Sequence, residues 1–331
     1  MDIRVKEGVV MIKIGIELIL TNMCNLNCRY CYVNKSNPEI ISYSDIKSVL
    51  NRVLEQNWFD GNVYFFGGEP SICSTLIEVV NRDYGDKCNL FITSNGHFIF
   101  NENKNYLLKM FKGVSITLEA NEDAYNFYRG ESNLSDKIKT LLELDKSDRE
   151  KITVNISINK KMFENIDETI ENYNKIKSGN IKVHLYSIKG DDGYSSPVDF
   201  FNDLISLKEK SIDLYNEIVR PGIESDAEFL CTFDNKLSLT PSGKIVGCEA
   251  LNNECANIEN IDSFIDGYKK EISKNHVSLY DQCKNCDLNV GDCQISCPSY
   301  INDLIKNKRF DELDLKCSME RVKNYLRKME E

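Results

Sequence analysis

The sequence Cys24-Asn-Leu-Asn-Cys28-Arg-Tyr-Cys31 follows the apolar run Gly15–Thr21 and places three cysteines within eight residues. Three thiolates at the spacing C-x3-C-x2-C on one tight loop can bind three irons of a four-iron cluster. Zinc is the alternative, but zinc normally takes four ligands, often from C-x2-C pairs. The next cysteine along the chain is Cys73. The spacing therefore favours an iron–sulfur cluster and leaves one iron free for an exogenous group.

Two later stretches follow the next two expected strands. Gly67-Gly68-Glu69-Pro70 comes after Val63–Phe66, and Ser94-Asn95-Gly96 comes after Leu90–Thr93. The carboxyl ends of parallel strands form the face on which barrel enzymes assemble their sites. The three stretches resemble, in order, the cysteine, GGEP and TNG motifs of the radical S-adenosylmethionine superfamily. Tyr30 is the aromatic residue of the first motif.

The resemblance implies a mechanism. The three cysteines would hold one [4Fe-4S] cluster, whose free iron would bind the amino and carboxylate groups of S-adenosyl-L-methionine. The backbone at Gly67 and Gly68 and the Glu69 carboxylate would hold the ammonium by charge-assisted contacts. Reduction would break a carbon–sulfur bond and release a 5′-deoxyadenosyl radical, which abstracts hydrogen from the substrate. The other motif residues expected at the cofactor are Tyr30, Pro70, Ser94 and Asn95.

The fourth and fifth expected strands add candidate cofactor contacts. Relatives commonly carry a Ser-Leu-Asp-Gly turn where this chain has Thr117-Leu-Glu119-Ala. Thr117 and Glu119 are expected at the cofactor despite this departure. Arg129, in Tyr-Arg-Gly, resembles the family's Arg-Gly ending and is either a partner for a carboxylate or a surface arginine. Ser157 or Asn159 on the fifth strand is a further candidate.

Apolar runs alternate with amphipathic stretches through the first 190 residues. The expected strands are Gly15–Thr21, Val63–Phe66, Leu90–Thr93, Gly113–Leu118, Ile152–Ile158 and Ile181–Tyr186. The expected helices are Ser44–Glu55, Ser74–Asn81, Asn103–Phe111, Leu134–Leu144 and Asn165–Ile176. Strands separated by helices predict right-handed βαβ units and a parallel sheet. The fold class is therefore α/β, with a partial (β/α)6 barrel over residues 1–190. Cys73, Cys88 and His184 are expected to be buried core residues.

A second unit is expected after the barrel. The polar stretch Lys189–Pro197 ends the barrel, and Asp199–Val219 is expected to be a bridging helix within residues 191–226. Residues 227–331 hold eight of the thirteen cysteines and show no regular periodicity. Such a segment is expected to fold around metal rather than around a wide apolar core. We therefore predict a cysteine-rich iron–sulfur auxiliary domain there.

The C-terminal cysteines resemble the SPASM domain, although C-x2-C pairs also suit a zinc ribbon. Six residues separate the second and third cysteines of the main run, where the usual pattern has five. By resemblance, one auxiliary cluster would take Cys283, Cys286, Cys293 and Cys317, and the other Cys231, Cys248 and Cys297. The chain would then hold three [4Fe-4S] clusters. Cys255 lies outside this pattern. It is either a fourth ligand, a hydrogen donor in an epimerisation, or an inert thiol.

Composition narrows the partners and the compartment. The 331-residue chain has a formal net charge of −11, which argues against nucleic acid as a partner. The sequence shows no secretory signal and no uncharged apolar stretch of the ~18 residues a membrane span needs. Thirteen cysteines cannot all pair internally. Thiols stay reduced in the cytoplasm, so we expect a cytoplasmic metalloprotein.

The SPASM resemblance implies an enzyme that modifies a ribosomally made peptide. Thioether formation is preferred because an open iron on an auxiliary cluster could hold a substrate thiolate, while epimerisation and carbon–carbon bond formation stay open. The expected partners are the peptide, an electron donor such as flavodoxin or ferredoxin, and a separate leader-recognition protein, since only 23 residues precede Cys24. The alternatives are an anaerobic sulfatase-maturing enzyme, which makes formylglycine, and a non-catalytic iron–sulfur electron carrier.

Overall fold

The computed structural model describes residues 13–100, 104–188, 191–219, 236–247, 254–256, 258, 261 and 310–329. Within these ranges nine strands form one sheet in the order β6-β5-β4-β3-β2-β1-β7-β8-β9. The first six are β1 (Ile14–Thr21), β2 (Phe59–Gly67), β3 (Asn89–Ser94), β4 (Gly113–Leu118), β5 (Ile152–Ile158) and β6 (Lys182–Ser187). All neighbouring pairs among these six are parallel, so the expected parallel α/β sheet is confirmed.

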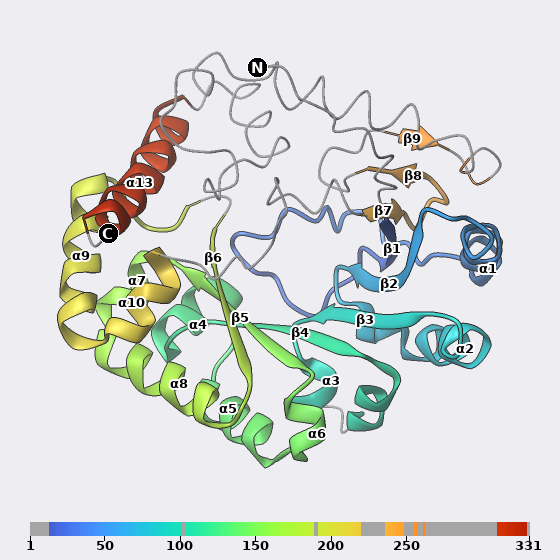
Figure 1. The fold of residues 1–331 in the computed structure, drawn as a ribbon, viewed down its shortest axis with the longest axis horizontal. Coiled ribbons are helices and arrows are strands. Elements are labelled where there is room, and N and C mark those ends of the chain that lie inside the picture. The colour runs from blue at the N-terminus through green and yellow to red at the C-terminus, as the bar shows by residue number, and fades with distance from the viewer. Residues whose placement is uncertain are drawn as a thin grey trace, which may run out of the picture.

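Helices cover one face of this sheet (Figure 1). They include α1 (Tyr43–Val53), α2 (Ser74–Tyr84), α3 (His97–Phe100), α5 (Leu134–Glu143), α6 (Lys146–Arg149) and α8 (Ile166–Ser178). Strand residues on the covered face, such as Leu18, Phe65 and Ile116, are fully buried. This core includes Cys73 and Cys88, as expected.

Along β4 to β6 the opposite, inner face of the sheet is polar and partly open to solvent. Thr117, Asn155 and His184 lie side by side on it in register across β4, β5 and β6. His184 is exposed, so the expectation of a core histidine is wrong. Its Nδ1 lies 3.3 Å from Oδ1 of Asn155. Partial enclosure by the concave sheet still lowers the pKa of His184.

Helix α4 (Glu122–Arg129) was not expected from the sequence, although its ends carry ordinary signals. Asn121 accepts a hydrogen bond from the Ala124 N–H at 2.9 Å, and two acidic residues occupy the first turn. Gly130 ends the helix at φ 68°. Two further short elements follow strands of the sheet. They are the 3-10 helix η1 (Pro70–Cys73) after β2 and α7 (Lys160–Glu164) after β5.

Two expected helices have a different form. The segment predicted as a helix over Asn103–Phe111 contains the 3-10 helix η2 (Asn105–Met110). A 3-10 helix rises ~2.0 Å per residue against ~1.5 Å for an α-helix, so it reaches β4 with few residues. The expected bridging helix is two helices, α9 (Pro197–Lys210) and α10 (Ile212–Val219). Ser211 separates them with extended backbone, and its hydroxyl accepts from the Leu214 N–H at 3.4 Å.

The C-terminal third contributes to the same sheet. Strand β7 (Lys236–Leu239) lies parallel to β1, and β8 (Ile245–Val246) and β9 (Glu254–Ala256) continue antiparallel. Helix α13 (Phe310–Lys328) packs against α9 and α10 (Figure 1). A buried ion pair between Lys316 and Asp192 ties α13 to the segment after β6. Among the described residues, no helix is long and apolar enough to cross a membrane.

Candidate active site at the carboxyl ends of the strands

The cysteine loop begins directly after β1. Cys24 and Cys28 are partly buried and Cys31 is exposed. The loop is tied to its surroundings by the Arg29 N–H, which donates to the Tyr128 carbonyl at 2.8 Å. Within the described ranges, His, Cys, Asp and Glu side chains form no group of three that could hold a metal as they stand. The three thiols share one loop.

Burial raises the pKa of the Cys24 and Cys28 thiols. The positive charge of Arg129 opposes this increase at Cys28, and Lys35 opposes it at Cys24. Thiols of raised pKa remain protonated at neutral pH, and a metal must displace those protons to bind. The electrostatic effect on Cys28 also places Arg129 near the loop.

Two glycines bring the loop after β2 against the segment that precedes Cys24. The Gly68 N–H donates to the Thr21 carbonyl at 2.7 Å. A Cβ at Gly67, whose φ is +139°, would lie 2.2 Å from the Thr21 carbonyl oxygen. A Cβ at Gly68 would lie 2.1 Å from the Met23 carbonyl oxygen. Only glycine permits this approach at both positions.

Glu69 is buried and links two of the predicted motifs. Its Oε1 accepts hydrogen bonds from the Ser71 N–H at 3.0 Å and from the Ser94 hydroxyl at 2.8 Å. Its Oε2 accepts from the Asn95 N–H at 2.7 Å. Pro70 begins η1 directly after it. Much of the hydrogen-bonding capacity of this carboxylate is thus used within the protein.

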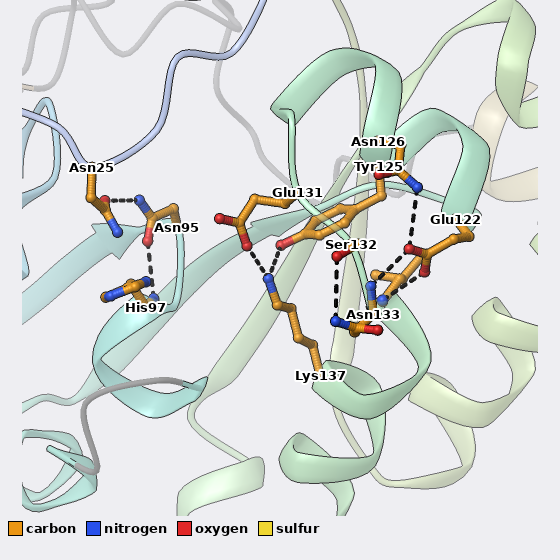
Figure 2. A network of polar contacts seen from close by, with 11 residues as sticks. Asn25, Asn95, His97, Glu122, Tyr125, Asn126, Glu131, Ser132, Asn133 and Lys137 are labelled. Atoms are coloured by element: carbon orange, nitrogen blue, oxygen red, sulfur yellow. Dashed lines mark hydrogen bonds and ion pairs between the residues drawn. The ribbon is translucent and has the colours of Figure 1, made fainter.

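Asn95 joins the third motif to the cysteine loop. Its side-chain N–H donates to Oδ1 of Asn25 at 2.7 Å, and its Oδ1 accepts from the His97 N–H at 2.9 Å (Figure 2). The same amide lies 3.9 Å from Sγ of Cys24. The three motifs recognised in the sequence are therefore in contact at one edge of the sheet.

Tyr30 reaches from the loop into a second set of polar residues. Its hydroxyl donates to Oε1 of Glu119 at 2.6 Å and accepts from Nη1 of Arg129 at 2.9 Å. Burial raises the pKa of Tyr30 well above its usual range, so the phenol keeps its proton. Arg129 is 4% exposed, so the surface alternative is wrong. Its Nε is buried and has no hydrogen-bond partner among the residues that the structure describes.

Glu119 is the centre of this second set. Ser157 donates a short hydrogen bond to Oε2, and the Asn159 side chain donates to the same oxygen at 3.4 Å. Burial raises the pKa of Glu119 to about 7, although Arg129 and the three donors oppose the increase. Ser157 and Asn159 thus bind a carboxylate of the protein itself, while Thr117 lies on the inner face of β4.

Two supporting groups could not be predicted from the sequence. Tyr186 on β6 lies against Tyr30. Lys137 on α5 is buried beside a polar pocket of about 400 Å³ that is lined mainly by the end of α4, the loop after it and α5. Its ammonium contacts Glu131 and the Tyr125 hydroxyl, the latter at 2.9 Å (Figure 2). Glu131 follows Arg129 by two positions, so this partly buried contact anchors the end of α4.

The other predicted site residues lie apart from this edge or outside the described residues. Cys255 is in β9, and Cys317 is in α13, one residue after the buried Lys316. The remaining predicted ligands, Cys231, Cys248, Cys283, Cys286, Cys293 and Cys297, lie outside the described ranges.

Comparison with known proteins agrees with this architecture. Radical SAM cyclopropyl synthase TigE of Paramaledivibacter caminithermalis is 23% identical over 320 residues, which cover 86% of this chain and 67% of that protein. Native anSMEcpe with bound AdoMet and Cp18Cys peptide has a TM-score of 0.62 at 16% identity, over 95% of this chain and 99% of that chain. Streptococcus suis SuiB bound to precursor peptide SuiA has a TM-score of 0.57 at 18% identity, over 89% of this chain and 73% of that chain.

The two solved structures share the fold. Residues 18–190, more than half of the chain, match the family described as the Radical SAM superfamily. This match spans β1 to β6, the three motifs and the Tyr30–Glu119–Arg129 contacts. With its family match and the geometry of its three motifs, the chain belongs to the Radical SAM superfamily.

Proposed function

We propose that this protein is a radical enzyme that modifies a ribosomally made peptide after translation. The observation that carries the proposal is the meeting of the cysteine, GGEP and SNG loops at the carboxyl edge of the sheet, next to an open polar inner face. The TigE relative supports the radical chemistry in this proposal, since that protein is named as a radical SAM cyclopropyl synthase. The solved neighbours that hold peptides share the fold and add nothing about the substrate.

The residues present suit a [4Fe-4S] cluster with S-adenosyl-L-methionine. Cys24, Cys28 and Cys31 supply three soft thiolate ligands on one loop, the donor type that iron–sulfur clusters use. Among the described residues the buried Nε of Arg129 has no partner, and its guanidinium lies near Cys28, so Arg129 suits a carboxylate of the cofactor. When reduced, the bound pair supplies a 5′-deoxyadenosyl radical that abstracts hydrogen from substrate.

The protein's own residues then position and protect the reactants. The glycine pair places backbone against the cysteine loop, and Glu69 fixes the two neighbouring loops relative to each other. On the inner face, Thr117, Asn155 and His184 offer hydrogen-bonding groups to a peptide. Enclosure keeps His184 neutral at physiological pH, so it donates through one ring nitrogen and accepts through the other.

The proposed bond type is carbon–carbon, as in the ring that the TigE relative is named for. Thioether formation, preferred from the sequence, depended on an open iron in an auxiliary cluster. The cysteines proposed for that cluster, Cys231, Cys248 and Cys297, lie outside the described residues. Two auxiliary clusters, the external electron donor, the separate leader-recognition protein and the cytoplasmic location are parts of the same proposal.

The test is anaerobic reconstitution with iron and sulfide. Three clusters would give about twelve irons per chain, and replacing Cys24, Cys28 and Cys31 with Ala should leave about eight. The triple variant should make no 5′-deoxyadenosine with S-adenosylmethionine and dithionite. Cys73→Ala and Cys88→Ala are the matched controls, because both thiols are in the core. Zinc with little iron in anaerobically purified protein would overturn the proposal.

The peptide assignment needs a separate experiment. Small open reading frames beside the gene should be co-expressed with the enzyme and the products analysed by mass spectrometry. Loss of two hydrogens from a peptide, with a new carbon–carbon bond located by fragmentation, is the expected result. Formylglycine in a Ser- or Cys-containing sulfatase peptide would instead indicate a sulfatase-maturing enzyme. An absence of 5′-deoxyadenosine from fully loaded protein would indicate an electron carrier.

A further inference from the structure

The Tyr30 hydroxyl is the point where the cysteine loop meets the interior of the barrel. In the sequence Tyr30 stands between the second and third cysteines of the loop. Its hydroxyl lies 2.6 Å from Oε1 of Glu119 and 2.9 Å from Nη1 of Arg129. Glu119 follows β4 and holds Ser157 and Asn159 at the end of β5. One phenol therefore connects the loop to two strands and to the end of α4.

The length of the residue 119 side chain matters for this contact. The radical S-adenosylmethionine relatives that the sequence resembles commonly carry Asp followed by Gly here, whereas this chain has Glu119-Ala120. A side chain shorter by one carbon–carbon bond of about 1.5 Å would leave the carboxylate outside hydrogen-bond reach of the phenol. In this chain the longer Glu119 side chain reaches the hydroxyl of Tyr30.

The loop needs such an anchor because it has no regular secondary structure. Residues 22–35 contain turns and bends but no helix or strand. Asn25, Asn27 and Arg29 are exposed. Tyr30 is the residue of this loop whose side chain enters the Glu119 and Arg129 contacts.

We propose that the Tyr30 hydroxyl and the Glu119 carboxylate form a positioning pair that holds the cysteine loop and Arg129 in place on the barrel before any cluster is bound. The proposal rests on the proposed function in one respect, that Cys24, Cys28 and Cys31 are the cluster ligands. The pair orients groups that bind cluster and cofactor. Because Nη1 of Arg129 donates to the Tyr30 hydroxyl, this contact orients the guanidinium.

The first test uses iron-free protein and needs no cofactor. Hydrogen–deuterium exchange should be followed at the Arg29 amide, which donates to the Tyr128 carbonyl. We expect at least tenfold faster exchange in Tyr30→Phe and in Glu119→Ala, and little change in Glu119→Gln, which keeps an acceptor for the phenol. Tyr106→Phe is the matched control, because that hydroxyl binds Glu78 at the surface.

A double variant separates the pair from general destabilisation. Because both single changes break the same contact, Tyr30→Phe/Glu119→Ala should exchange at Arg29 no more than about twofold faster than either single variant. If the increases in Arg29 exchange rate in the two single variants multiply in the double variant, the two side chains act independently, and the proposal is overturned. Exchange in β2 and β3 monitors global folding. If Tyr30→Phe unfolds, Glu119→Asp, the shorter carboxylate, takes its place with the same expected increase.

The second test uses the loaded protein and a spectroscopic signature. In Tyr30→Phe, S-adenosylmethionine should produce a smaller change in the electron paramagnetic resonance spectrum of the reduced first cluster, with at least tenfold weaker cofactor binding. Unchanged exchange, spectrum and affinity would refute the positioning pair. If the exchange result holds but wild-type protein binds no iron through Cys24, Cys28 and Cys31, the positioning pair stands and the proposed function fails.

Discussion

The Glu69 carboxylate accepts a hydrogen bond from the backbone N–H of Asn95 at 2.7 Å. This contact crosses from the loop after β2 to the loop after β3. Because Asn95 also binds Asn25 on the cysteine loop, three separate segments are joined through two residues. The Glu69 carboxylate therefore holds these loops together, in addition to making the cofactor contact that its sequence motif predicts.

Replacing Glu69 with Gln tests both the loop contacts and the predicted cofactor contact. The amide cannot accept at both positions, so either Asn95 or the Ser71–Ser94 side loses its acceptor. We expect the free energy of unfolding of iron-free protein to fall by about 1.5–3 kcal/mol. Titration calorimetry of loaded protein should show cofactor affinity weakened by roughly tenfold or more. Glu78→Gln, at the surface, is the control, and an unchanged affinity in Glu69→Gln would exclude the assigned cofactor role.

The glycine pair gives a steric prediction. Gly68→Ala places a Cβ 2.1 Å from the Met23 carbonyl oxygen, so the backbone before Cys24 must move. Iron uptake by the first site should fall sharply, measured by iron content after reconstitution. Gly61→Ala is the control, because its φ is +83° with open space around it. It should cost about 1–2 kcal/mol of stability from backbone strain alone and leave iron content unchanged. Equal iron content in the two variants would contradict the steric argument.

The raised pKa of Glu119 predicts that the stability of the folded protein depends on pH. Its carboxyl has a pKa of about 7 in the folded protein, against an ordinary value of 4.5. Between these pH values the folded state holds a proton that the unfolded chain has released, so stability falls as pH rises. Relative to Glu119→Gln, iron-free wild-type protein should lose on the order of 3 kcal/mol from pH 4.5 to above 7. Denaturant titrations at several pH values measure this, and parallel curves would contradict it.

The buried ion pair of Asp192 and Lys316 predicts a large coupling free energy between the two side chains. Both side chains are about 95% buried, so Lys316→Met leaves an uncompensated charge and should cost about 3–5 kcal/mol. Adding Asp192→Asn should recover much of that loss in a double-mutant cycle. Lys175→Met, which breaks an exposed pair with Glu171, should change stability by less than about 1 kcal/mol. Additive losses in the cycle would show that the pair is not coupled.

Cys255 has three competing roles that one variant distinguishes. If the thiol is a cluster ligand, Cys255→Ala should lower the iron content or alter the spectrum of one cluster. If it donates hydrogen, clusters and 5′-deoxyadenosine formation should persist while product stereochemistry is lost. An inert thiol should change neither, at a stability cost of about 1 kcal/mol. We expect a ligand or donor role, and wild-type turnover with full iron content would contradict both.

The sequence predicted the parts of the site that depend on local spacing. Three motifs at strand ends could be placed together because parallel strands bring their carboxyl ends to one edge. The link between Tyr30 and Glu119, 89 positions apart, could not be read from the sequence, because a hydrogen bond depends on side-chain direction in the folded chain. His184 shows the same limit, since strand alternation leaves open which face is covered by helices.

The pairing of β1 with β7 has a consequence for synthesis. Ser238 donates to Glu17 at 2.8 Å across 221 positions of the chain. A ribosome adding roughly 5–20 residues per second needs on the order of 10–40 s to supply that partner. Until then β1 has one uncovered edge, and an uncovered strand edge templates pairing with other chains. Nascent or truncated chains that end before Lys236 are therefore expected to aggregate, and a chaperone that covers β1 during translation would raise the yield of folded protein.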